Sequence, residues 1–225
     1  MVAEVEKLGE LYGAWWIDFL GEHCHVGGEE VTQWLLDRSA PPPGPILDAG
    51  AFVGATARLL SRHGARVFAT DANPEFLAYG RGMPAGSEIV WVAAPNQRLP
   101  FPDLSFAAIW CLDAGAVPQE FSRIAAARAE LLLCTETPED GRGGAEAFVE
   151  EWAEFGWRVK AHRSVSGEAL QIWQRAEAQM VGRRSYYEPR YGKRSYLAQL
   201  DQVADLVRTY SMHELGHGLF VFERG

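Results

Sequence analysis

Apolar side chains recur at helical spacing through residues 1–40, and this pattern is interrupted at Gly21 and at Gly27-Gly28. Apolar positions three and four apart predict an amphipathic helix, and glycine favours a break in it. The run 41–45 holds four prolines and cannot lie inside a helix, because proline lacks the amide donor and clashes with the preceding turn. A helical N-terminal segment is therefore expected, separated from the rest of the chain by this run.

Beyond residue 45 the pattern changes, and short apolar runs rich in β-branched residues alternate with helical runs. The predicted strands are 46–49, 66–70, 88–93, 105–111, 129–135 and 157–164, and the predicted helices are 54–63, 74–81, 118–128 and 144–155. Such alternation is typical of βαβ units around a mostly parallel sheet with helices on both faces. The pattern predicts a doubly wound α/β fold.

The last part of the chain leaves two choices open. Residues 169–173 and 218–222 both have the pattern of a strand, and 194–210 between them has the pattern of a helix. Either strand could close the sheet in antiparallel orientation. We expect a single domain over 1–225, with a helical lid segment at 1–43, a cofactor-binding core at 44–175, and an extension at 176–225 that completes the sheet or the substrate pocket.

Composition and charge restrict the function classes. With 48% hydrophobic and 23% charged residues the chain is expected to be globular, and a net charge of −9 opposes nucleic acid, so a small-molecule partner is favoured. Three cysteines without a CxxC pair favour a reducing compartment. No stretch reaches the roughly 20 apolar residues of a membrane span, and the acidic N-terminus is unlike a signal peptide. We expect a cytoplasmic protein.

The first predicted strand-to-helix turn is a candidate nucleotide site. Asp48 ends the strand, Gly50 permits a sharp bend, and Gly54 allows the next helix to begin close to the sheet. Asp71 follows Gly50 by about twenty residues, where a carboxylate can accept both hydrogens of a ribose diol. Phe52 occupies the slot that dinucleotide sites keep for a second glycine. A nucleotide without a pyrophosphate is therefore favoured.

Three segments in order resemble class I S-adenosylmethionine-dependent methyltransferases: Leu47-Asp48-Ala49-Gly50 through Gly54, Phe68-Ala69-Thr70-Asp71-Ala72-Asn73, and 99–106. The third, Leu-Pro-Phe-Pro-Asp-Leu-Ser-Phe, is similar to the subgroup that acts on small molecules. The resemblance implies a Rossmann-like, seven-stranded sheet with S-adenosylmethionine as cofactor.

The resemblance also implies individual cofactor contacts. The residues concerned are Asp48, Gly50 and Ala51 near the methionine part, Asp71 at the ribose, Ala72, Asn96 and Gln97 near the adenine, and Cys111 and Leu112 facing the sulfonium, with Phe52 and Gly54 as further cofactor-binding residues of the first turn. Phe52 stands in place of the usual middle glycine, and Pro95 lies near a position where an aspartate often contacts adenine. These departures keep open a nucleotide-binding protein without turnover.

Substrate contacts are expected on the lid and on the C-terminal extension. The lid offers Tyr12, Trp15, Trp16 and His25, although the tryptophans could equally pack a helix on the sheet. His25 is the first candidate for a base or orienting donor, followed by Asp113 and Glu136, which come after predicted strands. Tyr186 and Tyr187 lie in a basic and aromatic run that could line a pocket, with nucleic acid as a less favoured partner.

A different chemistry is suggested by His213-Glu214-Leu215-Gly216-His217, which matches the His-Glu-x-x-His motif of zinc hydrolases. Glycines at 216 and 218 and the strand-like run that follows favour a turn, so no metal is expected. The sequence thus predicts an enzyme that transfers a methyl group from S-adenosylmethionine to an O, N or S atom of a small molecule by in-line displacement. A zinc hydrolase and a non-catalytic nucleotide-binding protein are the alternatives.

Overall fold

The computed structural model describes residues 14–139 and 144–225. Its centre is a seven-stranded sheet of order β3-β2-β1-β4-β5-β7-β6. The strands are β1 (Ile46–Ala49), β2 (Val67–Asp71), β3 (Ile89–Ala93), β4 (Phe106–Leu112), β5 (Ala125–Pro138), β6 (Trp157–Ser164) and β7 (Leu215–Arg224). The first five strands in this order are parallel, and β7 runs antiparallel to both of its neighbours. The predicted mostly parallel, Rossmann-like sheet is confirmed.

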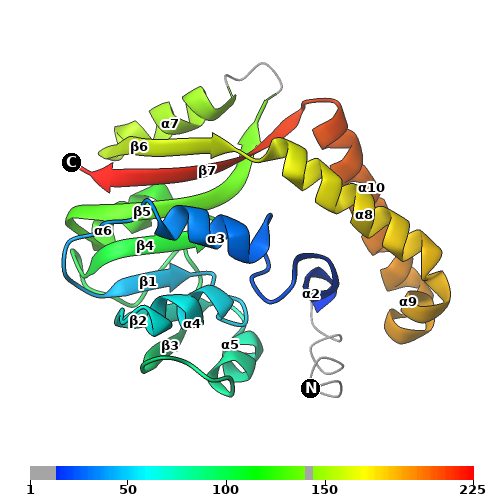
Figure 1. The fold of residues 1–225 in the computed structure, drawn as a ribbon, viewed down its shortest axis with the longest axis horizontal. Coiled ribbons are helices and arrows are strands. Elements are labelled where there is room, and N and C mark those ends of the chain that lie inside the picture. The colour runs from blue at the N-terminus through cyan, green and yellow to red at the C-terminus, as the bar shows by residue number, and fades with distance from the viewer. Residues whose placement is uncertain (1–13, 140–143) are drawn as a thin grey trace.

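The helices lie on both faces of this sheet and beyond one end of it (Figure 1). They are α2 (Ala14–Leu20), α3 (Gly28–Leu36), α4 (Ala55–Arg62), α5 (Pro74–Arg81), α6 (Pro118–Ile124), α7 (Gly144–Glu154), α8 (Ser166–Gly182), α9 (Arg184–Tyr191) and α10 (Lys193–Ser211). None of the helices in the described part of the chain is both long enough and apolar enough to cross a bilayer.

Two apolar layers hold the helices to the sheet. In one layer, α3, α4, α8 and α10 pack against sheet residues such as Trp110 and Leu132; in the other, α6 and α7 pack against Ile109 and Leu133. Every residue of β4 is buried, as expected for a central parallel strand covered on both faces, whereas β6 alternates between buried and open positions at the sheet edge. The centre of the sheet is therefore covered on both faces, and its edge at β6 is more open.

One of the two candidate closing strands is wrong. Residues 169–173 lie inside α8, where Ala169, Trp173, Ala176 and Met180 are buried at helical spacing. A five-residue apolar run is compatible with a buried strand and with part of a buried helix. Only the spacing of apolar residues over a longer segment distinguishes the two. The other candidate is right: β7 contains 218–222 and inserts between β5 and β6. The predicted helix 118–128 ends at Ile124, where β5 begins.

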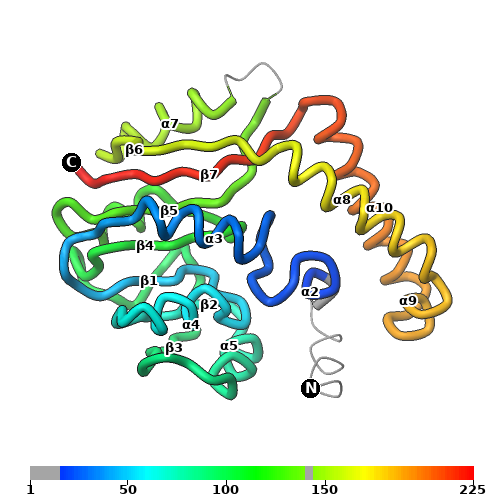
Figure 2. Tube along the Cα trace, viewed as in Figure 1, coloured from blue at the N-terminus to red at the C-terminus, as the bar shows by residue number. Residues whose placement is uncertain are grey.

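Helices α8, α9 and α10 form an arm that extends beyond the sheet, and α2 lies beside it (Figures 1 and 2). The sequence boundary at residue 175 falls within α8, so one continuous helix joins the sheet to the arm. Trp16 of α2 meets Trp173 of α8 edge to face, with ring centroids 5.4 Å apart. The N-terminal segment is thereby packed against the arm on the side of the sheet where parallel strands end.

Candidate active site

A cavity of about 220 Å³ lies at the carboxyl ends of the first four strands. Its lining residues are Gly50, Asp71, Ala72, Pro95, Asn96, Gln97, Ala114 and Gly115. Gly50 has a φ of +74°, and a Cβ there would overlap the Cβ of Ala114. In a doubly wound sheet this edge is where ligands bind. We call this cavity the cofactor cleft.

Asp71 lies at the end of β2, and its carboxylate stabilises the turn after β1 by a hydrogen bond. Its Oδ2 accepts the backbone N–H of Phe52 at 2.9 Å, and its Oδ1 accepts that of Asn73 at 2.8 Å. Burial raises the pKa of Asp71, although these two hydrogen bonds oppose the shift. Each carboxylate oxygen keeps a lone pair for a further donor, so the predicted contact with a ribose diol remains chemically possible.

Asp48 lies behind the cleft and does not line it. Its side chain is buried, its Oδ2 has no hydrogen-bond partner in the described residues, and burial raises its pKa to about 7. The cleft itself offers the Asp71 carboxylate and the side-chain amides of Asn96 and Gln97, which can bond the hydroxyls and the base of a nucleoside. The residues of this cleft therefore fit the nucleoside part of S-adenosylmethionine.

The other predicted cofactor residues support the cleft from behind. Phe52 has a φ of +51° and packs on Phe76 of α5, with ring centroids 4.4 Å apart. A Cβ at Gly54 would overlap the ring of Trp91, which explains the glycine at the start of α4. Buried residues that do not line the cleft are Ala51, Phe52, Cys111 and Leu112. The Cys111 thiol donates to the carbonyl of Ala114 at 3.0 Å and so shapes the loop that does line it.

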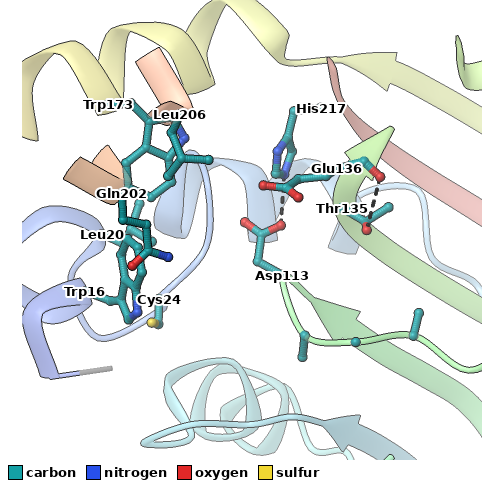
Figure 3. A pocket seen from close by; sticks show the side chains of 13 residues that line it. Trp16, Leu20, Cys24, Asp113, Thr135, Glu136, Trp173, Gln202, Leu206 and His217 are labelled. Atoms are coloured by element: carbon teal, nitrogen blue, oxygen red, sulfur yellow. Dashed lines mark hydrogen bonds and ion pairs between the residues drawn. The ribbon is translucent and has the colours of Figure 1, made fainter. Parts of the chain in front are cut away.

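A second cavity, of about 370 Å³, lies between the sheet edge and the helices α2, α8 and α10 (Figure 3). One wall carries Trp16, Leu20, Cys24, Trp173, Gln202 and Leu206, and the opposite wall carries Asp113, Ala114, Gly115, Ala116, Thr135, Glu136 and His217. A volume of this size falls at the small end of pockets that hold small-molecule ligands. We call it the acceptor cavity.

His217 is the most deeply buried ionisable residue of the acceptor cavity. Its Nε2 lies 2.9 Å from Asp113 Oδ1 and its Nδ1 lies 2.8 Å from the hydroxyl of Tyr210. Burial alone would lower the pKa of His217, but the charge and the hydrogen bond of Asp113 overcome it and hold the pKa above its ordinary value. Burial likewise opposes ionisation of Asp113, and His217 reverses this and lowers the pKa of Asp113. The two side chains form an ion pair in which His217 is buried and Asp113 is partly exposed to the cavity.

Asp113 also connects the sheet edge to the N-terminal segment. Its Oδ2 accepts the backbone N–H of Val26 at 2.8 Å, in the turn between α2 and α3. Asp113 has a φ of +49° and Cys24 a φ of +53°, and both residues line the acceptor cavity. Left-handed backbone at residues other than glycine carries strain that the surrounding structure has to hold, and such strain clusters at functional sites.

Glu136 is the third predicted catalytic residue, and its side chain opens into the acceptor cavity. Burial and the neighbouring Asp113 raise the pKa of Glu136, and His217 partly offsets this. Asp113 and Glu136 are thus brought together on one wall, as Figure 3 shows. Both come from strand ends, which is why the sequence pattern could find them.

His25 is not on that wall. It is fully buried, with Nε2 at 2.8 Å from Thr32 Oγ1 and Nδ1 at 3.0 Å from the carbonyl of Val26. Burial lowers the pKa of His25 to about 4, so it is neutral at physiological pH. Both ring nitrogens are already engaged, and the prediction that His25 is a base facing the substrate does not match this geometry.

The predicted substrate residues divide in a similar way. Trp16 lines the acceptor cavity, whereas Tyr12 lies outside the described residues, and Trp15 is placed only as part of α2. Tyr187 is buried in the arm, where its hydroxyl accepts from Gln179, and Tyr186 is exposed beside Arg183. Neither tyrosine lines the acceptor cavity. Sequence reasoning missed Trp173 and Gln202, since nothing local marks residues that a distant arm brings to the sheet.

The zinc-hydrolase motif does not have its helical geometry. His213 lies in the turn after α10, Glu214 is paired with Arg208, and His217 lies in β7. A metal could instead meet Asp113, Cys134 and His217, whose ligand atoms all lie within 4.8 Å of one another. These atoms already bond to each other, and burial raises the pKa of the Cys134 thiol well above its ordinary value. The zinc-hydrolase alternative therefore loses its structural basis.

Comparison with known proteins gives the same assignment of the core. Residues 46–133 match the family model of a methyltransferase domain, and no curated protein sequence matches the chain. A protein described as a sarcosine dimethylglycine methyltransferase from Galdieria sulphuraria has a TM-score of 0.76 at 18% identity, over 92% of this chain and 94% of the other.

Two further solved structures share the fold. The cyclopropane synthase MmaA2 from Mycobacterium tuberculosis has a TM-score of 0.77 at 15% identity, over 99% and 98% of the two chains. Geranyl diphosphate C-methyltransferase from Streptomyces coelicolor A3(2), determined with S-adenosyl-L-homocysteine, has a TM-score of 0.65 at 14% identity, over 86% and 75%. The likeness extends beyond the matched domain to the N-terminal helices and the arm.

Proposed function

We propose that the chain is a class I S-adenosylmethionine-dependent methyltransferase, with its methyltransferase domain at residues 46–133, and that its two cavities hold its two substrates. S-adenosylmethionine lies in the cofactor cleft, and a small molecule with a nucleophilic O, N or S atom lies in the acceptor cavity. One observation carries this proposal: Ala114 and Gly115 line both cavities, so the two ligands meet at the loop after β4.

Methyl transfer requires the protein mainly to position the two substrates. Bound S-adenosylmethionine supplies a methyl group on a positively charged sulfur, and in-line displacement then requires an aligned nucleophile and exclusion of water. Asp71 is placed to accept the ribose hydroxyls, and the bare backbone of Gly50 lets the ligand approach the loop at Ala114. Trp16, Leu20 and Leu206 exclude water from the acceptor side.

Among the predicted catalytic residues, we assign the proton-accepting role to Glu136 and positioning roles to Asp113 and His25. The geometry supports this division, because the Glu136 carboxyl faces the acceptor cavity and forms no ion pair with another described residue, while Asp113 is held by His217 and Val26. His25 supports the turn that carries Cys24 and Val26, through its bonds to Thr32 and to the Val26 carbonyl.

We also propose a cytoplasmic location and no nucleic-acid partner. Cys24, Cys111 and Cys134 are thiols without a disulfide, which suits a reducing compartment. The net charge of −9 and the carboxylates on the cavity wall both oppose a polyphosphate. The names of two structural neighbours also contain small molecules: sarcosine dimethylglycine in the Galdieria protein and geranyl diphosphate in the Streptomyces enzyme.

Calorimetric titration with S-adenosylmethionine and S-adenosylhomocysteine tests the cofactor half of the proposal. We expect micromolar binding to the unmodified protein, at least a tenfold loss in Asp71→Ala, and no change in Asp201→Ala. Asp201 lies on α10 with its side chain exposed, so this variant controls for the loss of one carboxylate. Absence of binding to the unmodified protein, or equal binding by the two variants, would overturn the assignment.

A further inference from the structure

The acceptor cavity is lined by carboxylates and by no lysine or arginine among the described residues. Asp113 and Glu136 lie on the sheet wall, and among residues 14–139 and 144–225 His217 is the only histidine that lines the cavity. An anionic acceptor, such as a phosphate ester or a carboxylate, would meet two acids here and find no guanidinium or ammonium group to bind it. The charge of the wall thus discriminates against anions.

The two carboxylates are not equivalent. Asp113 is paired with His217 at 2.9 Å, and it also accepts the backbone N–H of Val26, so its charge is compensated inside the protein. Glu136 has no hydrogen bond or ion pair from its side chain within the described residues, although it opens into the same cavity. One negative charge therefore remains uncompensated in a partly enclosed space, where charges are screened less than in water.

The opposite wall offers aromatic surface to a cation. Trp16 and Trp173 line the cavity in an edge-to-face pair, and Trp is the side chain whose ring binds cations best. Trp173 is 6% exposed, and its neighbours Leu20 and Leu206 add apolar surface. A ligand with an apolar body and a positively charged end is complementary to both walls (Figure 3).

We propose that the methyl acceptor is a primary or secondary amine, bound as an ammonium ion with its nitrogen at Glu136 and its apolar part against the wall that carries Trp16 and Trp173. This inference rests on the proposed methyl transfer and narrows the acceptor atom from O, N or S to N. Glu136 thereby selects the substrate as well as receiving its proton.

The reaction balances with the groups present. The ammonium N–H gives its proton to the Glu136 carboxylate, which leaves a lone pair on nitrogen. That lone pair forms the new N–C bond while the S–C bond of bound S-adenosylmethionine breaks with its electron pair going to sulfur. The products are a methylated ammonium ion, S-adenosylhomocysteine and a protonated Glu136, which then loses its proton to solvent. Burial raises the pKa of Glu136, which favours uptake of the proton.

A matched set of probes tests the charge preference directly. Phenethylamine, 2-phenylethanol and 3-phenylpropanoate present a similar apolar body with a positive, neutral or negative end. Their binding is measured by calorimetry in the presence of saturating S-adenosylhomocysteine. We expect phenethylamine to bind about tenfold more tightly than the alcohol, as a single charge-assisted contact provides, and the carboxylate to bind more weakly than both.

Glu136→Gln keeps the shape of the side chain and removes its charge. We expect this variant to bind phenethylamine and 2-phenylethanol equally, with its affinity for S-adenosylhomocysteine unchanged. Glu150→Gln, an exposed position on α7, removes the same charge far from the cavity and should keep the preference of the unmodified protein.

Two outcomes separate this inference from the function beneath it. If S-adenosylhomocysteine fails to bind, the methyltransferase proposal itself fails. If S-adenosylhomocysteine binds but the amine binds no better than the alcohol, or Glu136→Gln leaves the preference intact, the amine inference is overturned while the proposed function stands.

Discussion

Gly50 shows how one residue type determines a ligand site. Its φ of +74° belongs to the left-handed region, and the space where its Cβ would lie is filled by Ala114. A side chain would therefore strain the backbone and also displace the loop that separates the two cavities. Glycine is needed at position 50 for two reasons. It permits the bend after β1, and it allows the loop after β4 to approach closely.

Gly50→Ala is expected to lose at least tenfold in affinity for S-adenosylhomocysteine, measured by calorimetry. Gly64→Ala is its matched control, because Gly64 has a φ of +83° and nothing within 4 Å of an added Cβ. Gly64→Ala should lose roughly 1 kcal/mol of unfolding free energy through backbone strain, and Gly50→Ala should lose more because its Cβ also overlaps Ala114. Only the variant at position 50 should lose the ligand, and equal ligand affinity in both would refute the steric role of Gly50.

The same scale shows what a sequence can reveal about individual side chains. The positions of Asp71, Asp113 and Glu136 were predictable, because each lies at or near the carboxyl end of a strand, which must lie at the ligand-binding edge. His25 and His217 were not, since burial decides their roles and burial depends on distant segments. His25 is hydrogen-bonded to Thr32 and to the Val26 carbonyl. His217 lines the acceptor cavity from β7, although the glycines around it favour a turn in the sequence.

At the scale of elements, the ion pair of Asp113 and His217 joins three separate parts of the chain. Asp113 follows β4, His217 lies in β7, and Val26 precedes α3. The hydrogen bonds of one carboxylate thus fix the N-terminal segment over the sheet edge. Since α2 directly precedes the turn that contains Val26, the pair also helps to hold Trp16 at the acceptor cavity.

This pair predicts a definite pH dependence of stability. The pKa of His217 is raised in the folded protein, so its contribution is fully present below the unfolded pKa of about 6.5 and is lost as pH rises through the folded value. The pKa of Asp113 is lowered, so its contribution is present above about 3.9 and is lost as pH falls through the folded value. The pair stabilises most between about pH 4 and pH 6.5.

Asp113→Asn should therefore reduce the unfolding free energy by about 2 kcal/mol at pH 5.5 and by clearly less at pH 9, measured by urea denaturation. Asp205→Asn removes an aspartate whose partner Arg208 lies on the exposed surface, and it should change little at either pH. A loss in Asp113→Asn that is the same at both pH values would show that the pair does not ionise as described.

Element boundaries show where local patterns stop being informative. The βαβ core was predictable because its strands are buried on both faces and its turns carry glycine and aspartate at fixed spacing. The assignment of 169–173 as a strand failed because α8 presents one narrow apolar stripe to the sheet and leaves Gln171 and Gln174 exposed. Only contacts with β7 and α10 explain that stripe, and these are distant in sequence.

At the scale of the whole molecule, ligand binding and folding use the same contacts. The cofactor cleft is formed by loops after β1, β2, β3 and β4, so a ligand there joins four segments of the sheet. Residues of α2 and of the arm form the opposite wall of the acceptor cavity. A ligand that binds only the folded state must then raise the stability of the entire domain.

S-adenosylhomocysteine at one hundred times its dissociation constant should add about 2.7 kcal/mol to the unfolding free energy. For a domain of this size the melting temperature should rise by about 5 to 11 °C, measured by calorimetric scanning. NAD at the same concentration should leave it unchanged, because Phe52 packs on Phe76 where a dinucleotide site needs bare backbone. Gly50→Ala should lose the shift with S-adenosylhomocysteine and Gly64→Ala should keep it, since only the first blocks the cleft. A comparable rise of the melting temperature with NAD would mean that the turn after β1 accepts a pyrophosphate and that Phe52 does not exclude a dinucleotide.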